Sequence, residues 1–212
     1  MKYLTIIYSL IFTVLVLCKA EEAQCRKLVP ITDNTGKQAV ELRSTFERLS
    51  VSQVQSMPNV SIREMTQTGF FGHSTINHGY EPKIIKGDIV IADHSTGLMW
   101  QQSGSPDYMK WDKAEGWVDG LNRQGYAGYT DWRLPTVEEA ASLLESGKMS
   151  GNLYIDSIFN KAQYHIWTGD TGFIYGTKAA WGASFDYGGV SWNSIKYDIG
   201  YVRPVRSVLN RQ

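Results

Sequence analysis

The order of apolar and polar residues predicts short strands and hairpins in the C-terminal two-thirds of the chain. Residues 88–93 form a β-type run, and turn-forming residues separate them from the apolar residues 98–100. Two apolar runs with turn residues between them are typical of a hairpin. Apolar and polar residues also alternate on both sides of residues 187–189, which predicts a second hairpin with one exposed face. Further short apolar runs, at 165–169 and 201–208, complete an expected antiparallel sheet.

One segment has the periodicity of an amphipathic helix. It opens at Trp111 and ends before Gly125. Its apolar positions are spaced by three and four residues, as on one face of a helix: Ala114, Trp117, Val118 and Leu121. We therefore expect a helix that packs on the sheet.

A second helix is indicated by its start signal. Thr136 and Glu139 have the T-x-x-E spacing of a capping box, in which each side chain bonds to a backbone amide of the other residue. The box predicts a helix that begins at Val137 and ends at Gly147. Two helices packed on a twisted antiparallel sheet with long loops make an α+β domain.

Composition divides the chain near Lys86. All seven Trp residues lie between Trp100 and Trp192, and sixteen of the twenty Gly residues lie beyond this point. Residues 86–212 are therefore expected to form the main domain. Residues 21–85 read as an N-terminal extension with one short helix, because apolar residues recur at roughly helical spacing within residues 40–54.

The first twenty residues have the anatomy of a secretory signal peptide. A basic start at Lys2 precedes an apolar run over residues 6–17, and Ala20 offers a small residue for cleavage. The run is shorter than the roughly 20 apolar residues of a membrane span. We expect a mature protein without a transmembrane span that is secreted, periplasmic or on the cell surface. An uncleaved anchor and lipidation at Cys18 or Cys25 stay open.

Charge gives no argument for a polyanionic partner. The chain has 21 Lys and Arg residues and 21 Asp and Glu residues, so no net field favours nucleic acid or an anionic membrane surface. Residues 86–212 hold twelve basic and fourteen acidic residues, whereas residues 178–212 hold five basic and two acidic ones. Any charge-driven partner would have to meet such a local excess.

Four motifs in a fixed order resemble one known family. Residues 93–101 read Asp-x-x-Thr-Gly-Leu-Met-Trp-Gln, and Trp111-x-x-Ala114 follows. Residues 125–136 read Gly-Tyr-Ala-Gly-Tyr-x-Asp-Trp-Arg-Leu-Pro-Thr, and residues 201–206 read Tyr-Val-Arg-x-Val-Arg. This succession resembles the DUF1566 family, also called the Lcl C-terminal domain family, over residues 86 to 208.

The resemblance implies a C-type-lectin-like fold in an exported protein. The family takes its second name from a collagen-like adhesin whose domain is linked to binding of sulfated glycosaminoglycans. Many members carry one cysteine in the first helix and another in the final motif, where this chain has Val118 and Pro204. The disulfide that the family pattern implies is therefore absent, and packing must replace it.

The residues give no indication of catalysis. Residues 86–212 hold no cysteine, and no nucleophile, base or carboxylate pair stands in a recognisable pattern, so we expect a protein that is not an enzyme. His73 and His78 are a weak metal signal, whereas Arg133 and Trp132 are read as structural. No cofactor is expected, and the metal ligands are unknown. A calcium site is left open by analogy with C-type lectins, with four oxygen donors: Asp156, Asp170, Asp186 and Asp198.

The sequence places ligand binding in loops 168–200, which are rich in Trp, Tyr, Gly, Asn and Ser. The expected partner is a glycan, possibly sulfated, or a protein, met by basic residues and one exposed arginine of the final motif. A structural envelope component that uses the same face for subunit contacts is the alternative, and homo-oligomerisation stays open. The candidate ligand-binding residues are Lys178, Trp181, Tyr187, Trp192, Lys196 and Tyr197.

Overall fold

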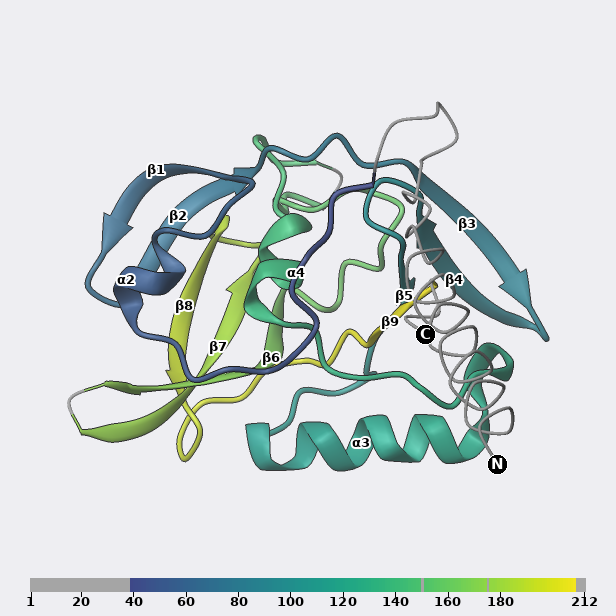
Figure 1. The fold of residues 1–212 in the computed structure, drawn as a ribbon. Coiled ribbons are helices and arrows are strands. Elements are labelled where there is room, and N and C mark those ends of the chain that lie inside the picture. Colours follow the sequence, from purple (N-terminus) through teal and green to yellow (C-terminus); the bar gives the residue numbers. More distant parts are fainter. Residues whose placement is uncertain (1–38, 150, 175, 209–212) are drawn as a thin grey trace, which may run out of the picture.

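The protein is an α+β structure built from two antiparallel sheets and few helices (Figure 1). The computed structural model describes residues 39–149, 151–174 and 176–208. The expected α+β class is therefore confirmed. The predicted signal peptide at 1–20, Cys18 and Cys25 lie outside the described residues.

The larger sheet has five antiparallel strands. Their spatial order is β1 (Val60–Thr66), β2 (Gly69–Ser74), β8 (Gly189–Ser194), β7 (Thr177–Ser184) and β6 (His165–Ile174). The predicted hairpin around 187–189 is confirmed, since β7 pairs with β8 from Ser184 opposite Gly189 to Ala179 opposite Ser194. Two of the five strands, β1 and β2, come from the N-terminal extension. They join the sheet because β2 pairs with β1 on one side and with β8 on the other.

The smaller sheet has four antiparallel strands. Their order is β3 (Tyr80–Ile85), β4 (Asp88–Asp93), β5 (Leu98–Gln101) and β9 (Val205–Ser207). The predicted hairpin of residues 88–100 is confirmed as β4 and β5. Lys86, where composition changes, lies in the turn between the paired strands β3 and β4.

The two predicted helices form where their signals placed them. Helix α3 (Trp111–Gln124) ends at Gly125, which adopts the left-handed conformation that glycine tolerates best. Helix α4 (Val137–Ser142) begins with the complete capping box of Thr136 and Glu139. The predicted end of α4 at Gly147 is wrong, because the helix stops at Ser142 after six residues. A short 3-10 turn, η1 (Tyr126–Gly128), follows α3.

The helix expected over residues 40–54 is reduced to α2 (Val51–Val54), one turn with its own capping box. The residues before it form an irregular segment that still buries Leu42 and Leu49. The apolar spacing therefore reflected contacts with the core and not a helix. Among the described residues no helix is long and apolar enough to cross a membrane.

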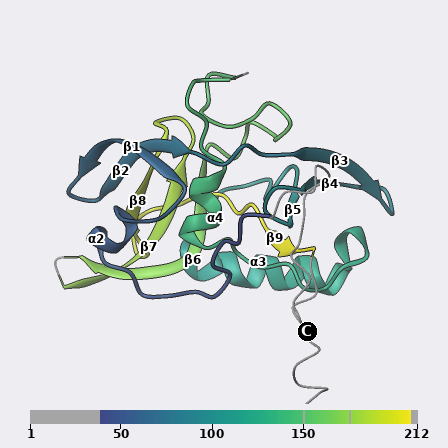
Figure 2. The same cartoon turned by 45° about the horizontal axis from the view of Figure 1, so that its top comes forward.

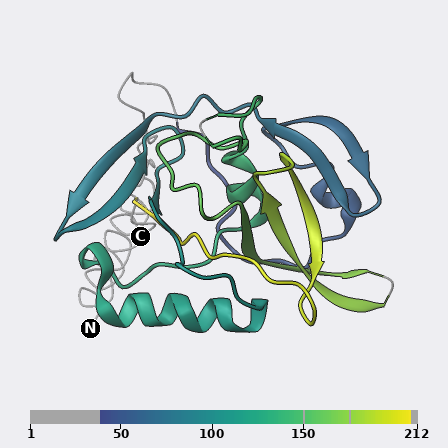
Figure 3. The same ribbon diagram turned by 180° about the vertical axis from the view of Figure 1, so that it is seen from behind.

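The two faces of the five-stranded sheet are covered differently. Helix α4 lies between the two sheets in Figures 1 and 2 and contacts β2, β6, β7 and β8. A core that includes Trp181, Phe185 and Val190 fills this inner face. On the outer face, α3 residues pack with Trp167 and Ala180 in a second core. The rest of the outer face, beside β8 and the loop that follows it, is open to solvent (Figure 3).

Candidate functional site

An open groove of about 530 Å³ lies on the outer face of the five-stranded sheet. Six segments contribute to it: the β1–β2 turn, β2, the start of β6, the β7–β8 turn, β8 and the loop after β8. Its volume lies within the range of about 300–1,000 Å³ that is usual for small-molecule sites. Polar and aromatic side chains line the groove, among them Tyr164, His165, Asp186, Tyr187, Ser191, Asn193, Tyr197 and Asp198.

Three solvent-exposed tyrosines line the groove. Tyr164 precedes β6, Tyr187 lies in the β7–β8 turn and Tyr197 lies in the loop after β8, with exposed fractions of 44%, 68% and 72%. Tyrosine combines a flat apolar face with a polar tip. The three rings therefore offer contact area for a ligand at three places along the groove.

Strand alternation determines which side chains enter the groove. In β8, Val190 belongs to the inner core and Trp192 packs against it, so Ser191 and Asn193 face outward. Gly182 of β7 lies beneath two polar side chains, because a Cβ there would come within 2.8 Å of His165 Nε2 and 3.1 Å of Asn193 Nδ2. The glycine thus lets both side chains lie directly on the sheet.

The groove is acidic. Asp186 and Asp198 both line it, whereas none of the residues that line it is a lysine or an arginine. Asp186 Oδ1 accepts hydrogen bonds from Ser184 Oγ at 2.5 Å and from the Tyr187 amide at 3.1 Å. Asp198 Oδ2 accepts one from the Ser194 amide at 2.6 Å. These bonds fix both carboxylates to their turns and orient them.

His165 also lines the groove. Burial lowers the pKa of its imidazole below the ordinary value of 6.5, and the nearby charges of Asp186 and Asp198 offset only part of this effect. The ring stacks edge-on against Trp167, with the ring centres 5.9 Å apart. At neutral pH the ring is therefore uncharged and offers one donor and one acceptor.

The structure separates the six predicted ligand-binding residues. Tyr187 and Tyr197 line the groove, and Lys196 stands beside it, with Nζ 4.9 Å from the centre of the Tyr197 ring. Trp181 is completely buried in the inner core, and its indole nitrogen donates to the Leu49 carbonyl at 3.3 Å. Trp181 therefore has no surface to offer a ligand.

The other two predicted residues also lie outside the groove. Trp192 is half-buried against the inner core, opposite Trp181 in the β7–β8 pairing. Lys178 lies near the far end of β7, with Nζ 5.1 Å from the centre of the Trp111 ring. Sequence reasoning did not select Tyr164 or His165. The signal for Ser191 and Asn193 was present, because they alternate with Val190 and Trp192.

The expectation of an exposed arginine in the final motif is wrong. Arg203 is fully buried, and burial lowers the pKa of its guanidinium to about 9. It donates to the backbone carbonyls of Gln102 and Asn160 and lies over the Phe159 ring. Arg206 is 8% exposed and forms an ion pair with Asp131 at 2.7 Å. Both arginines therefore hold the fold together.

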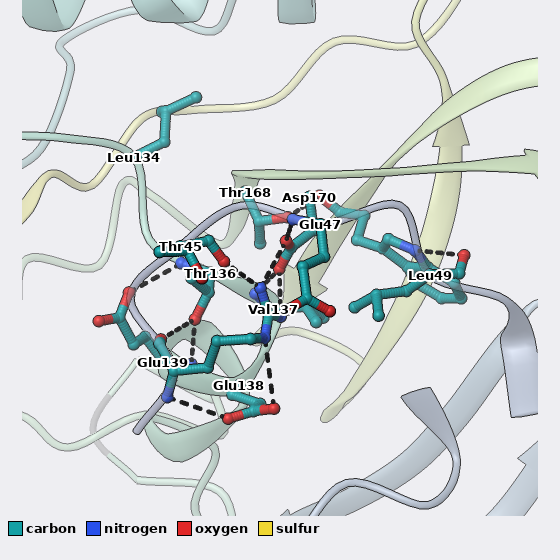
Figure 4. Close-up of polar contacts among 12 residues, drawn as sticks. Thr45, Glu47, Leu49, Leu134, Thr136, Val137, Glu138, Glu139, Thr168 and Asp170 are labelled. Carbon is teal, nitrogen blue, oxygen red and sulfur yellow. Dashed lines mark hydrogen bonds and ion pairs between the residues drawn. The ribbon is translucent and has the colours of Figure 1, made fainter. Parts of the chain in front are cut away.

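A second polar cluster surrounds the start of α4, where its side chains bond to one another and to backbone amides (Figure 4). The Asp170 side chain is fully buried and pairs with Arg43 while accepting hydrogen bonds from the Glu47 and Val137 amides. Next to it, Arg133 pairs with Glu139 at 2.6 Å, as the structural interpretation of Arg133 predicted. Trp132 is 2% exposed, which confirms its predicted place in the core.

The four aspartates considered for calcium do not gather at one place. Asp170 belongs to the buried cluster, and Asp156 accepts a hydrogen bond from the Ile158 amide. Across residues 39–149, 151–174 and 176–208, no three His, Cys, Asp or Glu side chains are grouped to hold a metal ion. His78 and His94 instead pair with Asp93 and Glu81.

The fold and the groove define a class: an α+β domain of two antiparallel sheets with an open, aromatic and acidic groove on one face. The family model for the Lcl C-terminal domain matches residues 89–206. The chain belongs to this family, and the resemblance found in its motifs is confirmed. No curated protein and no solved structure matches the chain.

Proposed function

We propose that the chain is an exported, non-enzymatic module that binds a glycan in the groove between Tyr164, Tyr187 and Tyr197. The observation that carries the proposal is the exposure of three tyrosine rings around a groove whose other walls are polar. Sugar rings have apolar faces that pack on aromatic rings and hydroxyl groups that need donors and acceptors. His165, Ser191 and Asn193 supply these polar partners.

The groove is better suited to a sugar than to an added peptide strand. The strands beneath it, β7 and β8, are each hydrogen-bonded to a neighbour on both sides. A peptide that binds by strand addition needs a free sheet edge. A ligand in the groove must therefore contact side chains on the face of the sheet, as a sugar ring does when it packs on aromatic side chains.

The proposed location, fold type and binding role are supported by the family and by the groove. Membership of the Lcl C-terminal domain family supports a surface or secreted location and a C-type-lectin-like arrangement of the two sheets and helices. The groove supports a binding role, because exposed tyrosine rings and polar side chains line it together.

Glycan arrays and calorimetry with the purified chain test the proposal. We expect retention of at least one glycan, and a loss of affinity of about tenfold or more for Tyr187→Ala and for Tyr197→Ala, since each ring supplies a large contact. Tyr108→Ala is the matched control, because Tyr108 is 55% exposed but does not line the groove.

Two results would count against glycan binding. Unchanged affinity in both groove variants would place the glycan elsewhere. Absence of any bound glycan, together with a dimer that dissociates when Tyr187 and Tyr197 are replaced, would favour a structural component that uses this face for subunit contacts.

A further inference from the structure

We propose that the groove selects glycans that carry free amino groups, with the ammonium groups bound by the carboxylates of Asp186 and Asp198. This inference rests on the proposed function and specifies the charge of the ligand. It differs from the expectation of a sulfated glycan, which would need a basic site.

The acidity of the groove is local. The chain as a whole is neutral, with 21 basic and 21 acidic residues. Two carboxylates nevertheless line the groove without a lysine or arginine among the lining residues. Both carboxylates line the same groove as His165, and the charge of each raises the pKa of that ring. A cationic group placed there would interact with both.

Each carboxylate keeps one oxygen for a ligand. The hydrogen bonds from Ser184 and Tyr187 both go to Asp186 Oδ1, and the bond from Ser194 goes to Asp198 Oδ2. Across the described ranges, Asp186 Oδ2 and Asp198 Oδ1 have no hydrogen-bond partner. A carboxylate that is anchored through one oxygen presents the other in a fixed direction, and an ammonium group has three donors to meet such oxygens.

No protein cation neutralises these two charges within the groove. His165 is uncharged at neutral pH, because burial lowers the pKa of its ring. The ring packs edge-on against Trp167 and lines the groove together with Asp186 and Asp198. The negative charge is therefore left for a ligand to compensate.

The nearest lysines are placed poorly for a sulfate group in the groove. Lys196 lies over the Tyr197 ring at the rim, and Lys178 lies over Trp111, which does not line the groove. A sulfate bound between the tyrosines would share the groove with Asp186 and Asp198, whereas no lysine lines it. Like charges placed together cost binding energy, so the groove disfavours anionic sugars.

Calorimetry at low salt with four probes of matched length tests the inference. The probes are a glucosamine hexamer, the fully N-acetylated hexamer, a heparin-derived hexasaccharide and a lysine hexapeptide, at a pH where the glucosamine amines are protonated. We expect the glucosamine hexamer to bind about tenfold or more tightly than the N-acetylated one, and the difference to shrink as salt screens the charges.

Amide variants remove the charge and keep the shape. Asparagine at position 186 or 198 retains an oxygen for the turn hydrogen bonds, so Asp186→Asn and Asp198→Asn should fold. We expect each to reduce the preference for the free amine and the double variant to abolish it. Asp119→Asn on the exposed side of α3 is the matched control and should keep the preference. An unchanged thermal unfolding temperature shows that a variant which loses binding is still folded. If Asp186→Asn does not fold, Asp198→Asn in the exposed loop tests the inference on its own.

The outcomes separate this inference from the proposed function. Equal binding of the two hexamers with dependence on Tyr187 and Tyr197 would overturn the selection for amines and leave glycan binding intact. Tighter binding of the heparin fragment would also overturn it. A lysine peptide that binds as tightly as the glucosamine hexamer and needs the same aspartates would overturn the assignment to a glycan. Absence of binding to every oligosaccharide would overturn the proposed function itself.

Discussion

Arg43 and Asp170 form a bidentate ion pair, with Nη1 and Nη2 of the guanidinium 2.8 and 2.7 Å from the two carboxylate oxygens. The pair joins the N-terminal extension to β6 and to the start of α4, because Asp170 also accepts the Val137 amide hydrogen bond. The Asp170 side chain has no exposed surface. Its charge therefore depends on partners from two other parts of the chain, the segment of Arg43 and Glu47 and the start of α4.

We expect Arg43→Met to lower the free energy of unfolding by about 3 kcal/mol, because it leaves a buried carboxylate without its counter-ion. Two backbone amides still bind Asp170, which holds the loss near the lower end of the usual range. Urea unfolding followed by circular dichroism measures the change. Arg63→Met on the exposed side of β1 is the control and should alter stability by less than about 0.5 kcal/mol. An equal, small effect of both variants would show that the pair contributes little.

A second prediction concerns the N-terminal extension. We expect a fragment of residues 86–212 to lack a cooperative unfolding transition, although it contains the whole match to the family model. The fragment loses the strand that pairs with β8 and four core side chains, Leu42, Leu49, Val54 and Phe70. It also leaves Asp170 without Arg43. Thermal melts and near-ultraviolet circular dichroism of the fragment and the longer chain make the comparison. A fragment that melts cooperatively at the temperature of the longer chain would show that it is an independent domain.

The parts of the fold that sequence predicted well are set by local chemistry. The capping box of Thr136 and Glu139 fixes the start of α4, and Gly125 fixes the end of α3. Residues 40–54 were misjudged because the same apolar spacing also fits an irregular segment that presses Leu42 and Leu49 into a core built by distant strands. Only the tertiary structure distinguishes these alternatives.

The groove was only partly predictable for the same reason. Its walls come from residues 66 to 199, and their meeting depends on the order of strands in the sheet. An abundance of aromatic residues predicted a binding region but did not tell inward from outward rings. Tyr187 and Trp181 lie six residues apart in one hairpin, yet one is 68% exposed and the other is buried.

This contrast gives a third prediction. We expect Trp181→Ala to lower the free energy of unfolding by about 3–5 kcal/mol, because it opens a large cavity in the inner core. Tyr187→Ala should change stability by less than about 0.5 kcal/mol, since its ring contacts solvent. Chemical denaturation of both variants provides the measurement. A mild effect at Trp181 would mean that the core closes around the missing ring.

The last prediction concerns pH and the carboxyl of Asp93, which lies at the end of β4. Burial alone would raise its pKa, but hydrogen bonds from His78, Thr96 and Ser95 outweigh burial and lower the pKa below its ordinary value. The unfolded chain takes up the proton near pH 3.9, whereas the folded chain takes it up only at a lower pH. Between these values the unfolded state binds more protons, so stability falls as the pH falls.

The stabilisation by Asp93 should therefore be complete above about pH 5 and disappear as the pH falls through the lowered pKa. We expect Asp93→Asn to cost about 2 kcal/mol at neutral pH, because four hydrogen bonds to a buried charge are weakened, including one from the Gly79 amide. The gap between the variant and the natural chain should narrow near pH 3. Urea unfolding of both proteins at the two pH values measures it, with Asp119→Asn as the exposed control. A gap of the same size at both pH values would mean that the carboxylate charge is not what the hydrogen bonds stabilise.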